Sequence, residues 1–494
     1  MPFHQVMGLA CKLLNIVSSC LCINRHLLIV RKGANPVSSN VAAARECGYS
    51  LINPTSEKEM NVKRHAVISG LCFKAFILTG LMVTNIANAE DAFWSALTGG
   101  KFDFSSRYRF EHVDDDLAPG GIPLQDAKAS TIRTTLGYKT GMFQNFDARI
   151  LLQDVRDVGI DDFNDGTGRP NAKVQYAVVA DPSDTDFIEG YLGFSGVPGT
   201  YIKAGRQLIT YRDAPHHRYI GTVLWRQNWQ NHDAISFTNT TLPYTTINYA
   251  YTWNVNRIFT DEALPSALAN FDSNSHLINI KYSGLSFGQL EGYTYLLDFE
   301  NSLPNSVATY GLRLNGNLPM TETIKGIYTA EYAIQDDYAD NPANVDEDYI
   351  LGELGVAFKL SGPVESVMLK FSYEQLSGNG TSSFQTPLAT GHAFQGWTDR
   401  FLVTPADGIK DYYLTTVVSV FGAKFIAEYH DINSDNLDYD FGEELDLLLT
   451  KTFYEHYTFG LKYGAYEADR NINNAAGSTA ADVSKFWGWV EVVF

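Results

Sequence analysis

The chain has 494 residues, a formal net charge of −19 and a mean hydropathy of −0.15. It contains no run of about 18 apolar residues, which excludes a polytopic helical membrane protein. After residue 89 the chain carries 28 basic and 53 acidic residues, and a net charge of −25 argues against nucleic acid as a partner.

The first 89 residues differ from the rest because they contain all five cysteines. Residues 60–89 have the parts of a secretory signal peptide: basic Lys63 and Arg64, an apolar stretch at 75–83, and an A-x-A cleavage site ending at Ala89. We therefore expect residues 1–59 to be an N-terminal extension from a misplaced start, Met60 to be the natural first residue, and Glu90 to begin the mature chain. A mature chain without thiols suits an oxidising compartment.

The mature chain is predicted to begin with one or two helical turns at 91–97, ended by Gly99 and Gly100. The next segment, 101–113, alternates with period two. Phe102, Phe104, Tyr108 and Phe110 share one face, whereas the other face carries Asp103, Ser105, Arg107, Arg109 and Glu111. An apolar face toward lipid and a charged face toward a wet lumen are typical of a transmembrane β-strand.

Seventeen further segments have strand character. They are approximately 129–140, 145–156, 185–195, 200–210, 232–242, 244–256, 274–284, 285–298, 306–317, 320–335, 347–361, 363–376, 409–420, 422–432, 439–452, 456–469 and 482–494. Short connections alternate with long ones, such as 114–128, 157–184, 211–231, 257–273, 336–346 and 377–408. This alternation favours short periplasmic turns and long external loops.

The last stretch, 484–494, ends the chain on an apolar, aromatic strand and Phe494. Such a strand needs a partner on its open side, and pairing with the first strand would close a barrel. A terminal Phe also resembles the signal that barrel-insertion machinery reads. We therefore predict an all-β protein in which residues 90–494 form a single antiparallel transmembrane β-barrel of about 18 strands. An edge strand of a soluble β-sandwich is the alternative for this stretch.

The predicted lumen faces carry basic side chains: Arg107, Arg109, Arg133, Arg149, Lys281, Arg313, Lys325, Lys370, Lys424 and Lys462. They share the lumen with carboxylates, including Asp103, Glu111, Glu291, Glu331, Glu353, Glu374 and Glu428. These charges are either ion pairs that stiffen the wall or a path along which an anionic solute moves. The second hypothesis expects Arg107 and Arg109 to point into water.

Other motifs are weaker. The long loops are acidic, which suits either plain solvation or divalent-cation bridges to lipopolysaccharide. A G-x-S-x-G motif at 284–288 lies across a tight turn rather than a strand–turn–helix, and His216-His217 has no second ligand cluster. The mature chain has no phosphate-binding glycine loop, Cys-x-x-Cys pair or dinucleotide fingerprint. We expect no catalytic residue, no metal and no cofactor.

Two segments carry a family resemblance. The first, 203–237, contains Gly205, Arg206, Gln207, Trp225, Arg226, Gln227, Asn228 and Asp233; the second, 392–411, contains Trp397 and Asp399. They resemble the alginate-export family of outer-membrane porins, although His232 stands where an aromatic residue is expected. The resemblance implies an 18-stranded barrel, passage of an anionic polysaccharide, and Arg206 and Arg226 near the lumen arginines.

The sequence thus predicts a passive channel in the bacterial outer membrane for an anionic solute, such as an acidic polysaccharide or oligosaccharide. Its expected partners are outer-membrane lipid, lipopolysaccharide, the barrel-insertion machinery and that solute. A general diffusion porin is the first alternative, and an outer-membrane enzyme or a structural or adhesin barrel is the second.

Overall fold

The computed structural model describes residues 86–115, 117–118, 122–469 and 481–494. The expected extension at 1–59 and residues 60–85 of the expected signal peptide lie outside the described residues. Helix α3 (Ile86–Thr98) precedes the sheet and continues across the expected cleavage site at Ala89. It is longer than the 91–97 turns that the sequence predicts, and it ends as expected, because Gly99 N donates to Ser95 O at 2.8 Å.

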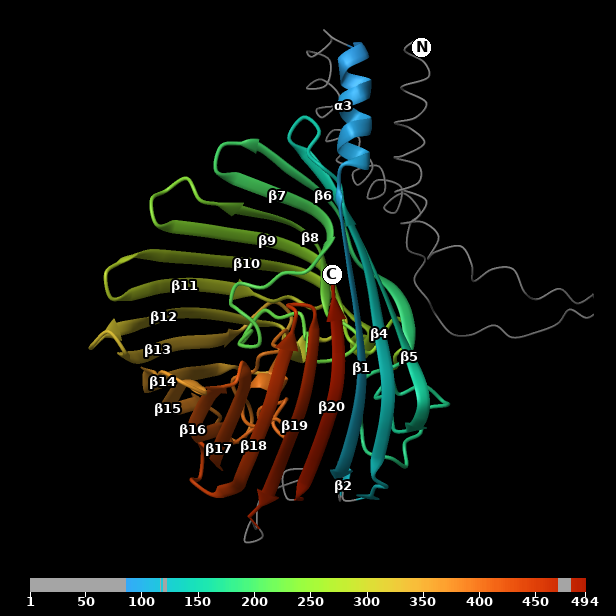
Figure 1. Ribbon diagram of the computed structural model, residues 1–494. Helices are drawn as coiled ribbons and strands as arrows, with labels where there is room; N and C mark the ends of the chain where they lie inside the picture. The colour runs from blue at the N-terminus through green and yellow to red at the C-terminus, as the bar shows by residue number, and fades with distance from the viewer. Residues whose placement is uncertain (1–85, 116, 119–121, 470–480) are drawn as a thin grey trace, which may run out of the picture. The chain divides into compact units, whose positions relative to one another are not determined.

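Eighteen strands form one closed antiparallel sheet (Figure 1). Their bounds are β1 (Lys101–Asp115), β4 (Ala127–Lys139), β5 (Phe146–Asp162), β6 (Asp184–Val197), β7 (Thr200–Gln207), β8 (Asn231–Asn239), β9 (Thr245–Asn256), β10 (Asn270–Leu285), β11 (Gly288–Leu296), β12 (Val307–Pro319), β13 (Ile324–Asp337), β14 (Asp346–Lys359), β15 (Val364–Leu376), β16 (Ile409–Val420), β17 (Ala423–Asn433), β18 (Asp440–Phe453), β19 (Tyr457–Ala468) and β20 (Val483–Val493). Each predicted strand has its counterpart. The fold class is confirmed.

Short elements lie within the long connections. They are β2 (Leu117–Ala118), β3 (Ile122–Pro123), α4 (Ser266–Ala269), η1 (Leu303–Asn305) and η2 (Gly391–Ala393). No helix among the described residues is long and apolar enough to cross a membrane.

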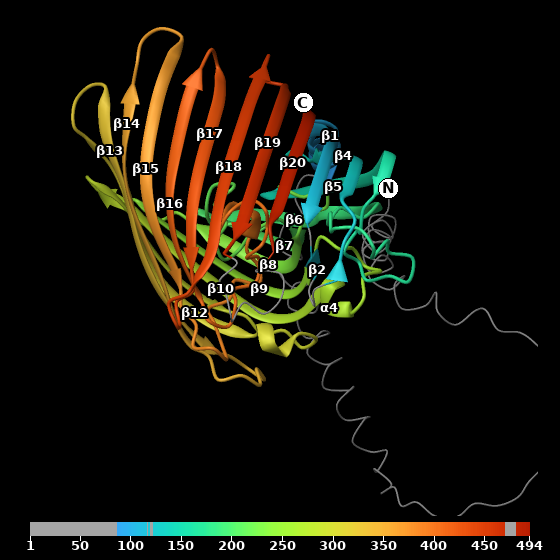
Figure 2. The same cartoon turned by 90° about the horizontal axis from the view of Figure 1, so that it is seen from below.

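The last strand closes the barrel by pairing with the first. The β1–β20 register runs from Ser105 opposite Val493 to Asp115 opposite Val483. Phe494 and Phe104 also exchange two backbone hydrogen bonds of 2.9 and 3.0 Å. The red β20 lies beside the blue β1 in both views (Figures 1 and 2). Closure leaves the sheet without an open edge, as the terminal strand requires.

The barrel wall has an apolar outside and a polar inside. Exposed outward side chains include Phe102 at 74%, Leu136 at 51%, Leu192 at 52%, Leu312 at 55% and Leu354 at 72%. So much exposed apolar surface on a closed barrel requires lipid around it. The alternate positions face inward and hold most of the buried charged residues. A barrel of this strand number is wide enough to leave a lumen that its own loops can enter.

Two of the long connections differ from expectation. Residues 208–230 join β7 to β8, and residues 377–408 join β15 to β16. Both were expected to be external loops, yet they contact inward-facing residues on both sides of the barrel and therefore occupy the lumen. We call them lumen loop A (208–230) and lumen loop B (377–408). They fold inward because their arginines, tryptophans and backbone groups find partners on the wall.

Candidate functional site in the barrel lumen

Lumen loop A is fixed to the β11–β15 side of the wall by arginines of the loop. Arg212 forms ion pairs with Glu291 at 3.3 Å and Glu331 at 2.6 Å, and Arg218 pairs with Glu374 at 3.0 Å. All three carboxylates are at most 4% exposed. Buried carboxylates need a cationic partner, and these arginines supply it.

On the opposite side, the wall supplies the arginine and the loop supplies the acceptors. Arg107 of β1 donates to Gln227 Oε1 at 3.0 Å and to the carbonyl oxygens of Leu224, Trp225 and Arg226 at 3.2, 2.9 and 2.7 Å. Four charge-assisted hydrogen bonds from one guanidinium hold this segment of loop A against β1.

Ion pairs next to Arg107 complete the attachment. Arg109 of β1 contacts Asp181 and Glu111, and Arg226 of loop A donates to Glu111 at 3.1 Å and to Asp399 of loop B at 2.9 Å. Arg109 and Glu111 are 1% exposed and Asp181 is fully buried. Both lumen loops, the β5–β6 connection that carries Asp181, and the wall therefore share one buried charge network.

A buried lysine joins loop B to the wall. Lys462 Nζ of β19 lies 2.6 Å from His392 Nε2, 3.7 Å from the centre of the Trp397 ring and 4.4 Å from that of Trp225. Burial, together with Lys462, lowers the pKa of His392 well below its ordinary value, so its Nε2 can accept from the ammonium. The Lys462 side chain is thus enclosed by aromatic rings and His392 and is not open to the lumen.

His392 also orients Asp399, which lies 2.7 Å from its Nδ1. Burial opposes the charged form of Asp399, but Lys485, His392 and Arg226 together hold the pKa of this carboxyl well below its usual range. Asp399 is therefore an anion that neutralises cations from β20 and loop A.

The expectation that Arg107 and Arg109 point into water is wrong. Both face the lumen, as the alternation predicts, but they are only 7% and 1% exposed. The physical reason is that loop A folds over them and takes up their hydrogen-bond donors.

The other basic residues selected from the sequence are also mostly paired. Arg133 donates to Glu491 at 2.7 Å and lies over the Trp229 ring, and Arg149 pairs with Asp103 and Glu189. Arg206 contacts Asp186 and Asp233, and Arg313 contacts Glu331 at 3.3 Å. Lys325 is exposed, and no ion pair or hydrogen bond of its side chain occurs among the described residues.

The family-motif residues fall into two groups. Trp225, Gln227, Asn228, Trp397 and Asp399 meet where loops A and B join the wall: Gln227 N donates to Asp181 at 2.7 Å, Asn228 to Pro182 O at 2.7 Å, and Trp397 N to Asp446 at 3.0 Å.

The second group lies on the β7–β8 pair that leads into loop A. Gly205 has φ +124°, and a Cβ there would stand 2.3 Å from Gly190 O, so only glycine fits. Gln207 donates to Ala234 O at 2.9 Å, and Asp233 accepts from Arg206 at 2.9 Å. These contacts stabilise the β7–β8 pair from which loop A begins, and the side chains that make them already have hydrogen-bond partners.

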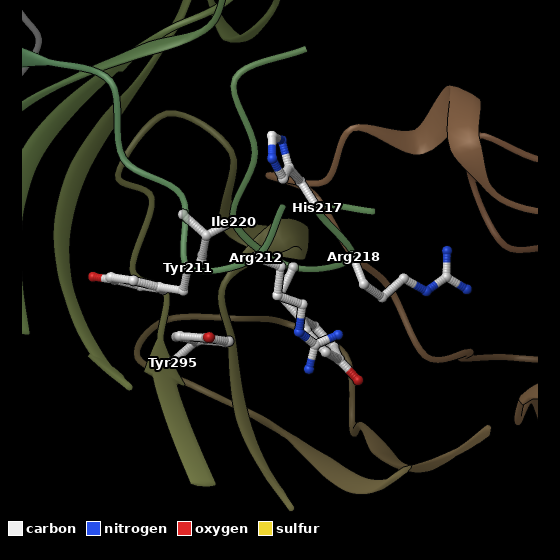
Figure 3. Close-up of a pocket in the computed structure, with 7 residues that line it drawn as sticks. Tyr211, Arg212, His217, Arg218, Ile220 and Tyr295 are labelled. Atoms are coloured by element: carbon white, nitrogen blue, oxygen red, sulfur yellow. The ribbon is translucent and has the colours of Figure 1, made fainter. Parts of the chain in front are cut away.

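A small pocket adjoins loop A and is lined by Tyr211, Arg212, His217, Arg218, Tyr219, Ile220 and Tyr295 (Figure 3). Tyr211 and Tyr295 stack with ring centres 6.1 Å apart. Its two arginines are already paired with three glutamates, so the pocket offers no uncompensated positive charge to an anion.

Sparsely paired positive charge lies instead at the mouth with the short turns, which the sequence predicts to be the periplasmic one. Six lysines occupy inward positions close to the periplasmic ends of their strands: Lys101 (β1), Lys139 (β4), Lys203 (β7), Lys325 (β13), Lys359 (β14) and Lys424 (β17). We call them the mouth lysines.

Pairing is sparse among the mouth lysines. Lys101, Lys325, Lys359 and Lys424 are exposed, and no ion pair of theirs occurs within the described residues. Lys139 lies 3.5 Å from Asp147, and Lys203 lies over the Tyr191 ring at 5.1 Å. Sequence reasoning selected Lys325 and Lys424 but missed the other four, although the same period-two alternation places them on the lumen face.

The described part of the chain contains no cluster of three or more His, Cys, Asp or Glu residues that could hold a metal ion.

Comparisons with known proteins identify the fold. No family model matches the chain, and no curated protein matches it. Several crystal structures do match. The structure of Acinetobacter baumannii OccAB2 is 14% identical in sequence with a TM-score of 0.62, and the match covers 81% of this chain and 99% of that chain. Pseudomonas aeruginosa OccK9 (OpdG) matches at 11% identity and TM-score 0.62, covering 81% and 100%. P. aeruginosa OpdK with vanillate matches at 12% identity and TM-score 0.58, covering 81% and 99%.

These matches do not support the resemblance to the alginate-export family. At such low identities they show the fold alone. The chain has the 18-stranded barrel fold of the Occ/Opd outer-membrane porins.

Proposed function

We propose that this protein is a passive channel of the bacterial outer membrane that favours small anionic solutes. The observation that carries the proposal is the contrast between two sets of lumen cations. The arginines are buried and paired with carboxylates or loop carbonyls, whereas the mouth lysines are mostly exposed and lack carboxylate partners.

The physical argument depends on which charges a solute can reach. A buried ion pair presents little net field, because each cation is neutralised within a few ångströms. An unpaired lysine ring in a confined mouth keeps its field, and rings of Lys or Arg favour anions in pores. Lys101 stands opposite Lys139, which stands opposite Arg149, so three cations lie in adjacent register on one part of the wall.

The arginines selected from the sequence have a different role in this proposal. Arg107, Arg109 and Arg226 hold loops A and B in place and thereby set the width of the pore. Arg133, Arg149, Arg206 and Arg313 stiffen the wall through ion pairs. We propose no reaction and no cofactor for any of them.

Acidic sugars are the finer candidate within this class. We propose uronate-containing oligosaccharides as the solute, and the support for them is the motif set at 203–237 and 392–411. Vanillate, which is present in the matching OpdK structure, is also a carboxylate. A general diffusion porin without charge preference is the competing function, because many of the lumen charges are compensated.

Liposome swelling separates these functions. Purified full-length protein in liposomes should admit gluconate faster than glucose, because the two solutes are similar in size and differ in charge. Replacing Lys101, Lys325, Lys359 and Lys424 by Gln should remove the preference without closing the channel. Equal rates for both solutes in the natural protein would favour a general porin, and no swelling at all would favour a blocked structural barrel.

A further inference from the structure

The two ends of the barrel carry opposite charge. The eight long connections other than loop A contain 15 Asp and Glu residues against five Lys and Arg residues. Two of the 15, Asp181 and Asp399, are paired inside the lumen, which leaves 13 acidic residues for the external end. Several of these carboxylates are well exposed, including Asp126 at 52%, Glu262 at 79% and Asp438 at 86%. The short-turn end has the six mouth lysines on its inner face, and its turns add only two acidic residues, Glu322 and Glu455.

Local pairing does not cancel the difference. Asp103, Asp147 and Glu189 are inward carboxylates near the mouth lysines. Asp103 and Glu189 are paired with Arg149, whereas Asp147 is 4% exposed, accepts from Tyr201 at 2.9 Å and lies 3.5 Å from Lys139. At the external end, Asp126 pairs with His112 at 3.4 Å, Glu262 with Arg169 at 3.1 Å and Asp438 with Lys410 at 3.4 Å. Exposed external carboxylates without an ion pair among the described residues remain at Asp261, Glu300 and Asp340.

The distance between the ends keeps their fields separate. A membrane-spanning barrel is about 30 Å tall across the hydrocarbon region. The Debye length is ~10 Å at 0.1 M salt and ~3 Å at 1 M. At 0.1 M each end therefore attracts its own counter-ions, with cations enriched outside and anions enriched at the periplasmic mouth.

We infer that the channel is electrically polarised along its axis, so that it captures anions from the periplasmic side and rectifies ion current. This inference rests on the proposed channel function and deepens it. A voltage positive on the external side drives cations inward from the acidic end and anions outward from the basic end. Cations and anions then both accumulate in the pore, and the conductance rises. The opposite voltage withdraws both carriers from the pore and conductance falls.

The test is single-channel recording, in planar bilayers with defined orientation, of the protein isolated from outer membranes, which we expect to begin at Glu90 and thus to contain no cysteine of its own. Because no cysteine follows Cys72, an Asn344→Cys variant places one thiol in the exposed external loop between β13 and β14. A membrane-impermeant thiol reagent that reacts from one chamber only then identifies the external side.

In about 0.1 M KCl we expect conductance to be about twofold higher with the external side positive, and the asymmetry to vanish at about 1 M KCl. Replacing Lys101, Lys325, Lys359 and Lys424 by Gln should abolish it. Lys451→Gln is the matched control, since Lys451 lies at the same end of β18 but on the outward face, where it donates to Phe421 O at 2.8 Å. This control should rectify like the natural protein.

Sided block gives a second readout. Tripolyphosphate added to the periplasmic chamber should interrupt the current with an on-rate at least about tenfold higher than from the external chamber. A symmetric current and equal on-rates in an anion-selective channel would overturn the polarisation while leaving the proposed function intact. An absence of conductance, or a lack of anion preference, would instead overturn the proposed function.

Discussion

The attachment of loop A to β1 gives the most direct test of how the lumen is built. Arg107 holds the loop through four hydrogen bonds, to one side chain and three backbone carbonyls. Arg107→Ala removes all four hydrogen bonds and leaves their acceptor oxygens buried beside Asp181. Breaking a buried, charge-assisted contact of this kind destabilises the docked loop by about 3–5 kcal/mol. The population of undocked loop should therefore rise by about two to three and a half orders of magnitude, since each ~1.4 kcal/mol is tenfold.

Thiol labelling measures that population directly. Thr222 of loop A is 1% exposed, so a Thr222→Cys variant should react slowly with a water-soluble maleimide while the loop is docked. Adding Arg107→Ala should raise the labelling rate about a hundredfold or more. Single-channel conductance should also become larger and noisier, because the loop leaves the lumen.

Arg149→Ala is the matched control for this prediction. Arg149 pairs with Asp103 and Glu189, so it joins strand to strand and touches neither lumen loop. Its loss should leave the labelling rate near that of the Thr222→Cys parent. Heat-modifiable mobility on unheated gels confirms that each variant is a folded barrel. Unchanged labelling in the folded Arg107→Ala variant would refute the reasoning that Arg107 fixes the loop.

Three further predictions address processing, assembly and pH. Peptide mapping of outer-membrane fractions should find Glu90 as the mature N-terminus, and a peptide from residues 1–59 would contradict it. Phe494→Ser should impair barrel assembly, because Phe494 pairs with Phe104 and stacks on His456 at 4.8 Å; a normal outer-membrane yield would contradict this. Loss of water around the imidazole within the lumen, reinforced by Lys370, lowers the pKa of His216, so His216 is neutral at pH 7. Anion selectivity should rise as the pH falls through that lowered pKa, and His216→Gln should remove this rise.

The sequence predicts the barrel well because its signal is local. Period-two alternation and the alternating connection lengths are properties of neighbouring residues, so each of the 18 strands could be placed within a few residues. The largest boundary differences have a local cause as well: β5 extends to Asp162 and β10 begins at Asn270, where polar residues continue the ladder beyond the membrane.

The lumen is harder to predict because its contacts join distant segments. Alternation correctly places Arg107 and Arg109 on the inner face, but it cannot say that residues 224–227, more than 100 positions later, cover them. Several long loops have similar lengths, and length alone does not select those that fold inward. The tryptophans and arginines of 208–230 are a usable signal in retrospect, since a fully external loop has little reason to carry three arginines and two tryptophans.

Four of the mouth lysines were missed in the sequence analysis for a different reason. Lys101, Lys139, Lys203 and Lys359 obey the same alternation as the selected arginines and could have been identified from it. What the sequence could not supply is the pairing state. Only the three-dimensional contacts separate the compensated guanidinium groups from exposed ammonium groups such as that of Lys359.

The reversal potential in a KCl gradient tests the central claim most directly, because it reports the sign of the charge that permeating ions meet. Full-length protein in a planar bilayer at about 0.1 M mean salt should be anion-selective. Replacing Lys101, Lys325, Lys359 and Lys424 by Gln should move the reversal potential to zero or to cation selectivity, whereas Lys451→Gln should leave it unchanged. Cation selectivity in the natural protein, unaltered by loss of the mouth lysines, would contradict the account.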